Sequence, residues 1–153
     1  FITSAPQLTQ LQIDQLIAQN PTLKHNQKLL CSITGIGKLT SQWLLPLLSA
    51  QRFTSARETA AFLGLVPCHK SSGTSLHTRG RLSGRGDANL RAKMFMPALA
   101  AVRHDPAMKA FYQHLVAKGK PKKVALTAVM RKLVHICYGV IKHQTPFIEQ
   151  YAT

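Results

Sequence analysis

Apolar residues recur at helical spacing through the first fifty positions of the chain. Over residues 8–19 their spacing favours a helix with one broad apolar face. Asn20–Pro21 should end this helix, because a residue that precedes proline is disfavoured in the helical conformation. A second helix is expected over about residues 24–32. A third is expected over about residues 39–48, where Pro46 should kink or shorten it.

The middle of the chain changes from helical periodicity to a glycine-rich pattern. Ser55 and Glu58 have the spacing of a capping box, which predicts a short helix that continues to Leu63. Residues 64–86 then hold five glycines and one proline among Ser, His and Arg. This composition predicts a loop or a short hairpin, and long loops in compact domains are usually functional or disordered.

Helical periodicity returns after residue 86. Asp87 is placed to cap a helix from Ala88 to Val102, with a kink expected at Pro97. Asp105–Pro106 should begin another helix, because proline suits the first helical position. The last helix is predicted over about residues 122–143. Its expected buried residues are Val124, Ala128, Leu133, Ile136, Cys137, Val140 and Ile141. The pattern therefore predicts a mainly α fold with one long glycine-rich basic loop.

The charge balance of the chain points to a polyanionic partner. Its 153 residues include 20 Lys and Arg but only 5 Asp and Glu, which gives a formal net charge of +15. Such charge repels itself in a folded protein unless phosphates neutralise it. Because 45% of the residues are hydrophobic, the chain should nevertheless fold. Nucleic acid is the expected partner rather than a membrane, since no apolar run reaches the roughly 18 residues that a span needs.

The cysteines indicate where the protein works and argue against a metal site. Cys31, Cys68 and Cys137 are far apart and show no CxxC spacing, so we expect a reducing, cytoplasmic environment without disulfides. A zinc site built from Cys68, His69 and His77 fits no common spacing and lacks a fourth ligand. The chain starts with phenylalanine rather than methionine, from which we expect a piece of a longer protein.

A short glycine turn, Ile33-Thr-Gly-Ile-Gly37, joins the second and third predicted helices. Gly35 and Gly37 permit a tight turn that exposes successive backbone N–H groups beside Lys38 and the start of a helix. This pattern is typical of a helix-hairpin-helix module, which holds a backbone phosphate without reading bases. The alternative is that the glycines only let two helices pack. Trp43 in the third helix is expected in the core rather than as a platform for base stacking.

The glycine-rich loop is the second candidate site. It carries Lys70, Arg79, Arg81 and Arg85, and its only acidic residue is Asp87 at its end. Arginines can hold a phosphate and stabilise the charge of a pentavalent phosphorus centre. A serine in that setting can attack phosphorus and form a covalent phosphoserine link. The alternative, which the residues alone favour, is a solvated loop whose serines cap turns.

Further basic residues lie outside the loop, whereas the acidic residues are scattered. Lys118, Lys120, Lys122 and Lys123 precede the last predicted helix as phosphate contacts or as solvated lysines, and Arg91 follows the loop. The five carboxylates of the chain do not form a metal-binding set, and at least two are better explained as helix caps. They are Asp14, Glu58, Asp87, Asp105 and Glu149.

Five short motifs occur in an order that resembles one transposase family. They are Ser32-Ile-Thr-Gly-Ile-Gly37, Phe53-Thr-Ser-Ala-Arg57, Ala61-Phe-Leu-Gly-Leu-Val-Pro67, Ser72-Gly73 and Gly84-Arg-Gly-Asp-Ala-Asn-Leu-Arg91. The family is the insertion-sequence one-ten family, which also contains the Piv-type invertases. The resemblance covers the C-terminal transposase domain, over about residues 26–143. It implies that residues 1–20 end a connecting helical segment and that residues 21–150 form the domain that engages DNA.

The resemblance also implies a chemistry. The serine of the family's Ser-Gly pair attacks the DNA backbone, and Ser72 stands at that position, with Ser71 beside it as an ambiguity of one residue. A RuvC-like domain with four carboxylates is implied outside this chain. Mg²⁺ is therefore expected there, and no cofactor is expected here. A structured guide RNA and a homo-oligomer assembled on DNA are further implications of the resemblance.

Two functions follow from these observations. In the first, the chain is the part of a DNA recombinase that supplies Ser72 as nucleophile. In the second, it is a helix-hairpin-helix module that binds DNA or RNA without chemistry. Both use the same candidate nucleic-acid-binding residues. These are Gly35, Gly37, Lys38, Lys70, Arg79, Arg81, Arg85, Arg91, Lys120, Lys122 and Lys123.

Overall fold

The computed structural model describes residues 9–50, 52–68, 81–82 and 86–148. Within these ranges the chain is mainly helical, which confirms the predicted fold class. The elements are α1 (Gln10–Gln19), α2 (Pro21–Cys31), α3 (Lys38–Ser49), α4 (Ala56–Phe62), β1 (Pro67–Cys68), β2 (Arg81–Leu82), α5 (Ala88–Lys93), α6 (Phe95–His104), α7 (Pro106–Ala117) and α8 (Lys122–His143). Strands β1 and β2 pair in antiparallel orientation, which agrees with the predicted loop or short hairpin.

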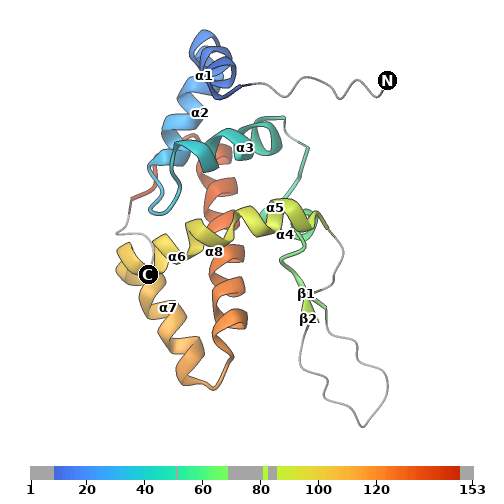
Figure 1. Cartoon of the computed structure of the whole chain (residues 1–153), viewed down its shortest axis with the longest axis vertical. Coiled ribbons are helices and arrows are strands. Elements are labelled where there is room, and N and C mark those ends of the chain that lie inside the picture. The colour runs from blue at the N-terminus through green and yellow to red at the C-terminus, as the bar shows by residue number, and fades with distance from the viewer. Residues whose placement is uncertain (1–8, 51, 69–80, 83–85, 149–153) are drawn as a thin grey trace.

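Helix α8 lies at the centre of the fold (Figure 1). It contacts α2, α3, α4, α6 and α7, so the core forms around it on several sides. Its fully or nearly buried residues recur along its whole length. They are Ala125, Leu126, Val129, Met130, Leu133, Val134, Cys137 and Val140. Trp43 of α3 is half-buried against this core, which confirms that it is a packing residue.

The composition of α8 also meets a test for membrane-spanning helices. Its 22 residues are long and apolar enough to cross a membrane by length and composition alone. A core helix of a soluble protein passes the same test, so a single helix of this kind is weak support for a span. The five helices that contact α8 cover its buried side chains.

Side-chain caps determine where most helices begin. Ser55 accepts a hydrogen bond from the N–H of Glu58, and Asp87 and Asp105 each accept from two N–H groups of the next helix. These caps confirm the predicted starts of α4, α5 and α7. Helix α2 begins three residues earlier than predicted, because Asn20 caps it and Pro21 occupies its first position.

The predicted kink at Pro97 is wrong. The segment from Ala88 to Val102 is divided between α5 and α6, and the break lies at Met94, whose side chain is fully buried in the core. Pro97 is the third residue of α6, where a backbone N–H has no acceptor within the helix, so its missing donor costs nothing. Likewise α3 is not shortened by Pro46, since it continues to Ser49.

The predicted burial along α8 is correct for three residues and wrong for Val124. That side chain is 44% exposed, because residues 117–124, at the connection between α7 and α8, are all exposed. Leu133, Cys137 and Val140 are buried as predicted. The remaining three are half-buried, namely Ala128, Ile136 and Ile141.

Two of the three cysteines have described side chains. Cys31 and Cys137 are both free thiols. Cys137 is fully buried, and burial raises the pKa of its thiol to about 12. It is therefore a small apolar core residue rather than a reactive group.

The turn between α2 and α3 is packed against α6. Gly35 has a φ of +95°, and a Cβ atom there would lie 2.6 Å from the carbonyl oxygen of Pro97. Ile33 and Ile36, on either side of Gly35, are both buried. The turn is thus part of the hydrophobic core, and only glycine fits at its closest approach to α6.

We predict that Gly35→Ala destabilises the protein by about 1–3 kcal/mol, because alanine meets both a strained φ and a backbone clash. Gly37→Ala is the matched control, since nothing lies within 4 Å of a Cβ atom at that position and its φ is −94°. Urea denaturation of both variants measures the difference. Equal free energies of unfolding would contradict the packing role of Gly35.

Candidate nucleic-acid interface

Gly37, the second glycine of the turn, is not packed against α6 as Gly35 is. Gly37 is exposed immediately before α3, and no side chain caps this helix. The first N–H groups of a helix have no intrahelical acceptor and carry partial positive charge. A shallow hollow of about 440 Å³ lies over residues 31–37. Gly35 therefore fulfils the packing alternative, whereas Gly37 leaves a helix start that an anion can reach.

Polar contacts hold the two helices on either side of this turn. Ser41 Oγ donates to the carbonyl oxygen of Lys38 at 2.6 Å and accepts from Gln27 Nε2 of α2 at 3.2 Å. Ser32 Oγ, at the end of α2, accepts from the N–H of Phe147 at 2.8 Å. The start of α3 is thus fixed relative to α2 and to the segment that follows α8.

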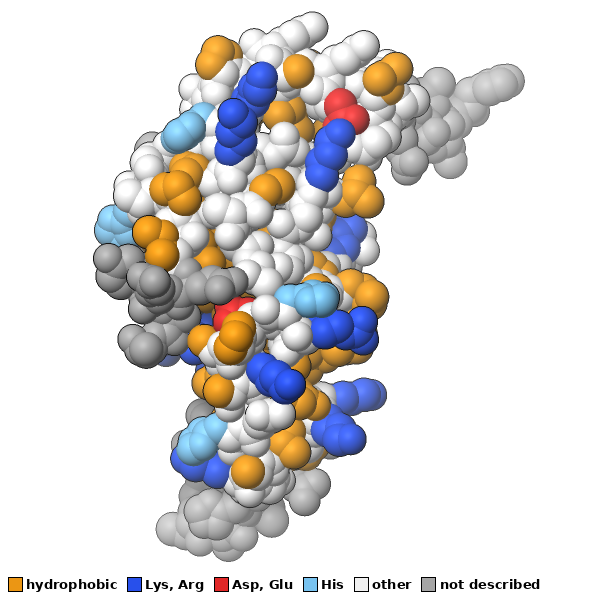
Figure 2. Space-filling model, turned by 90° about the vertical axis from the view of Figure 1, so that its left-hand side faces the viewer, with side chains coloured by type: hydrophobic (Ala, Val, Ile, Leu, Met, Phe, Trp, Pro, Cys, Tyr) orange, Lys and Arg blue, Asp and Glu red, His pale blue; other side chains and the backbone are white. Residues whose placement is uncertain are grey.

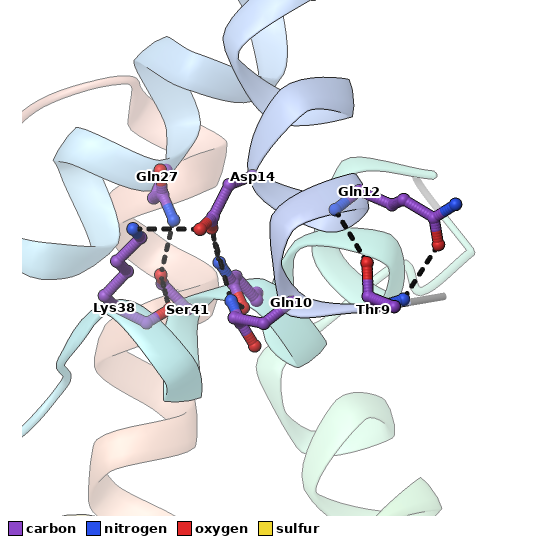
Figure 3. A network of polar contacts seen from close by, with 8 residues as sticks. Thr9, Gln10, Gln12, Asp14, Gln27, Lys38 and Ser41 are labelled. Atoms are coloured by element: carbon purple, nitrogen blue, oxygen red, sulfur yellow. Dashed lines mark hydrogen bonds and ion pairs between the residues drawn. The ribbon is translucent and has the colours of Figure 1, made fainter. Parts of the chain in front are cut away.

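Lys38, a predicted phosphate contact, is paired with a carboxylate of α1 (Figure 3). Its Nζ lies 3.2 Å from Asp14 Oδ2, and Asp14 Oδ1 accepts from Gln42 Nε2 at 2.6 Å and from Gln10 Nε2 at 3.2 Å. Burial raises the pKa of Asp14. The contacts with its partners, above all the one with Lys38, lower the pKa by more than burial raises it, so the pKa lies below its ordinary value. Without a ligand, Asp14 partly neutralises the cation beside the turn.

The two ends of the glycine-rich loop are held close together. Strand β1 places Pro67 opposite Leu82 and Cys68 opposite Arg81. Gly86 packs directly against Gly64, and its φ of +116° favours glycine. Of the predicted site residues in this loop, only the backbone of Arg81 lies within the described residues. Ser72, Lys70, Arg79 and Arg85 lie outside them, as do His69 and His77.

Arg91 follows the loop on α5 and has an unsatisfied group. Its side chain is half-buried, and its Nη1 atom is buried without a hydrogen-bond partner among the described residues. A buried donor that lacks an acceptor costs free energy, and charged donors cost most. An anionic oxygen at this position would satisfy it.

The predicted lysine group lies at the tip of the α7–α8 hairpin. Lys118, Lys120, Lys122 and Lys123 are all exposed there, and no side chain caps α8. A 22-residue helix is about 33 Å long. The turn between α2 and α3 lies toward the opposite end of α8, where Gln144 Nε2 donates to Asn26 Oδ1 of α2. The predicted basic residues therefore form separate patches.

A further basic group, which the sequence did not predict as a site, lies between α4, α7 and α8. It lines a groove of about 550 Å³. Arg131, Lys132 and His135 share one face of α8, and Arg57 comes from α4. The ammonium of Lys132 lies 4.5 Å from the ring centroid of Phe111 on α7. The spacing of Arg131, Lys132 and His135 along α8 can be seen in the sequence. Only the fold, however, brings Arg57 of α4 to the same groove.

The described carboxylates are engaged elsewhere. Asp87 and Asp105 cap helices, Asp14 binds Lys38, and Glu58 accepts two hydrogen bonds of 2.8 Å from Thr54, which hold its pKa low. No group of three or more His, Cys, Asp or Glu side chains that could hold a metal ion occurs among the described residues. On the face drawn in Figure 2, basic side chains recur from end to end and acidic ones are sparse.

Comparison with known proteins identifies the family. Residues 27–113 match the family described as Transposase IS116/IS110/IS902, and this is more than half of the chain. The chain belongs to this transposase family. The matched segment contains the turn between α2 and α3, the glycine-rich loop and Arg91, and it ends before α8.

Several relatives of this transposase family are similar over most of the chain. The chain is 41% identical to the pilin gene-inverting protein of Moraxella bovis over 144 residues, which are 92% of the chain and 45% of that protein. It is 31% identical over 135 residues to the insertion element IS110 uncharacterized 43.6 kDa protein of Streptomyces coelicolor. These residues are 88% of the chain and 32% of that protein. A probable family 20 transposase of Pseudomonas aeruginosa is 31% identical to the chain over 121 residues, which are 76% of the chain and 35% of that protein. The chain thus spans less than half the length of these relatives.

The groove beside α8 should make stability depend on pH. Burial, and then the charge of Arg131, lower the pKa of His135. The unfolded chain therefore binds a proton at higher pH than the folded protein, so the free energy of unfolding should fall as the pH drops below about 6.5. His135→Gln should reduce this dependence between pH 7 and 5, measured by urea denaturation. His114→Gln, at an exposed position of α7, is the control, and an equal effect of both variants would refute the assignment.

Proposed function

We propose that this chain is the DNA-engaging part of a transposase or DNA invertase that acts in the cytoplasm. The observation that carries the proposal is the family match over residues 27–113. The uncompensated basic surface supports it, because such a surface is suited to a polyanion. The similarity to a pilin gene-inverting protein and to a probable transposase supports recombination of DNA as the activity of the whole protein.

Three features support contact with the DNA backbone. The open start of α3 after Gly37 can hold a phosphate with backbone N–H groups, and Lys38 lies in its first turn. Arg91 has a buried donor for which the described part of the chain supplies no acceptor. The lysines at the tip of α7 and α8 are exposed and lie apart from the described carboxylates, each of which has another partner. Contacts of these kinds position a duplex but do not read its sequence.

The proposed nucleophile is Ser72, in the loop that β1 and β2 close. Its Oγ attacks the phosphorus of a phosphodiester and forms a phosphoserine ester. The bond from phosphorus to one sugar oxygen breaks, and that oxygen takes the proton that the serine gave up, which leaves a free sugar hydroxyl. Attack by a sugar hydroxyl of another strand then restores the serine and rejoins the backbone.

A structured guide RNA and a homo-oligomer on DNA complete the proposal and rest on the family resemblance alone. The second candidate function is a helix-hairpin-helix module without chemistry. The open start of α3 favours it, because this feature binds phosphate whether or not a strand is cut. Both functions require the basic residues, and only the first requires Ser72.

We expect Ser72→Ala in the full-length protein to abolish strand exchange and to leave DNA affinity within about twofold, because alanine removes the nucleophile but no positive charge. Trapping of a covalent protein–DNA adduct measures the step directly, and Ser71→Ala is the matched control. The 153-residue chain alone should bind DNA without recombining it. An adduct that persists in the Ser72 variant would remove this residue from the chemistry.

We expect Asp14→Asn to tighten DNA binding, because it releases Lys38 beside the turn. The slope of log K against log salt concentration should steepen by up to about one, the contribution of one additional phosphate contact. Glu58→Gln is the control, since it removes the same charge from a residue that binds Thr54 instead. Fluorescence anisotropy with a labelled duplex measures both. An equal effect of the two changes would show that Lys38 makes no specific phosphate contact.

A further inference from the structure

The groove between α4, α7 and α8 gathers basic side chains from two of these helices. Arg57, Arg131, Lys132 and His135 line it, together with the apolar side chains of Val66, Phe111 and Ala128. None of the described carboxylates lines it. Like charges that share a groove repel one another, and a bound anion would relieve that repulsion.

Packing holds Arg131 and Lys132 at the groove, whereas Arg57 and His135 are exposed. Lys132 Nζ lies over the ring of Phe111 at 4.5 Å, an attraction between a cation and an aromatic face. Arg131 and Lys132 are both half-buried, so their side chains are less free than those of exposed lysines. Burial, and then the charge of the neighbouring Arg131, lower the pKa of His135. Arg131 and Lys132 are therefore pre-arranged for an anion at a lower ordering cost than exposed side chains would have.

The groove lies at the base of the glycine-rich loop. Val66, one of its lining residues, comes immediately before β1. The end of α4, which follows Arg57 on the same helix, is tied to the start of α5 by a hydrogen bond of 2.9 Å from the N–H of Asp87 to the carbonyl oxygen of Phe62. An anion held in the groove would thus lie next to Val66, in the segment that leads into the loop.

We propose that this groove binds the phosphodiester backbone of duplex DNA, as a contact separate from the turn between α2 and α3. The inference rests on the proposed function and adds a site to it. Guanidinium groups suit phosphate because they donate two parallel hydrogen bonds. The ring of Phe111, the one aromatic side chain lining the groove, already faces Lys132. The groove is therefore better suited to a backbone than to stacked single-stranded bases.

The structural alternative is that Arg131 and Lys132 only cover Phe111 and Val66 with their apolar stems. In that case their charges would be dispensable for DNA binding. The double variant Arg131→Gln, Lys132→Gln removes two charges and keeps polar side chains of moderate length. Lys24→Gln, Lys28→Gln is the matched control, since it removes the same charge from exposed positions on α2.

The experiment measures the affinity of the 153-residue chain and both double variants for a duplex DNA over a range of salt concentrations. The groove variant should flatten the slope of log K against log salt by roughly two and weaken binding at least about fivefold at low salt. The control should change the slope by less than about one. In the unaltered chain, duplex DNA should also shift the NMR signals of the His135 imidazole.

Each outcome has a distinct meaning. If the unaltered chain does not bind duplex DNA, the proposed function fails. If it binds but the groove variant behaves like the control and His135 does not respond, only the groove assignment is overturned. A parallel titration with an RNA hairpin of equal charge tests the choice of DNA, and a loss confined to RNA would overturn it. Urea denaturation of both variants establishes that they are folded.

Discussion

The burial of α8 is the constraint on which the rest of the structure depends. Five helices pack around it, and the side chains that they cover run along its whole length. This packing positions the turn between α2 and α3 toward one end of α8 and the lysine tip at the other. It also brings α4 and α7 together over the middle of α8, where the groove forms. The spacing of the basic patches thus follows from the length of one helix.

The second determinant is how few acidic residues the chain has and where they are used. Asp87 and Asp105 cap helices. Asp14 pairs with Lys38, and Glu58 accepts hydrogen bonds from Thr54. Little negative charge is left to neutralise a surface that carries a formal excess of +15. The folded chain therefore has unbalanced charge, which a phosphate backbone can compensate by releasing its counterions.

Local signals in the sequence predicted most of the fold, because caps and prolines act within a few residues. Ser55, Asp87 and Asp105 begin helices as expected. The break at Met94 could not be predicted, since the burial of that side chain depends on the rest of the core. At the candidate site, Gly37 and Lys38 were predicted from their spacing, and they remain a prediction. The ion pair between Lys38 and Asp14 and the place of Arg57 in the groove beside α8 could not be predicted, because both depend on contacts between segments that are distant in the sequence.

The central claim is that unneutralised side chains on a helical scaffold hold the backbone of nucleic acid. The most direct test is the binding of the purified 153-residue chain to a short duplex of arbitrary sequence, measured as the salt concentration rises from low to physiological. We predict tight binding at low salt and a linear fall of log K against log salt, with a slope of several units. An affinity that is unmeasurable at low ionic strength, or one that does not change with salt, would contradict the account.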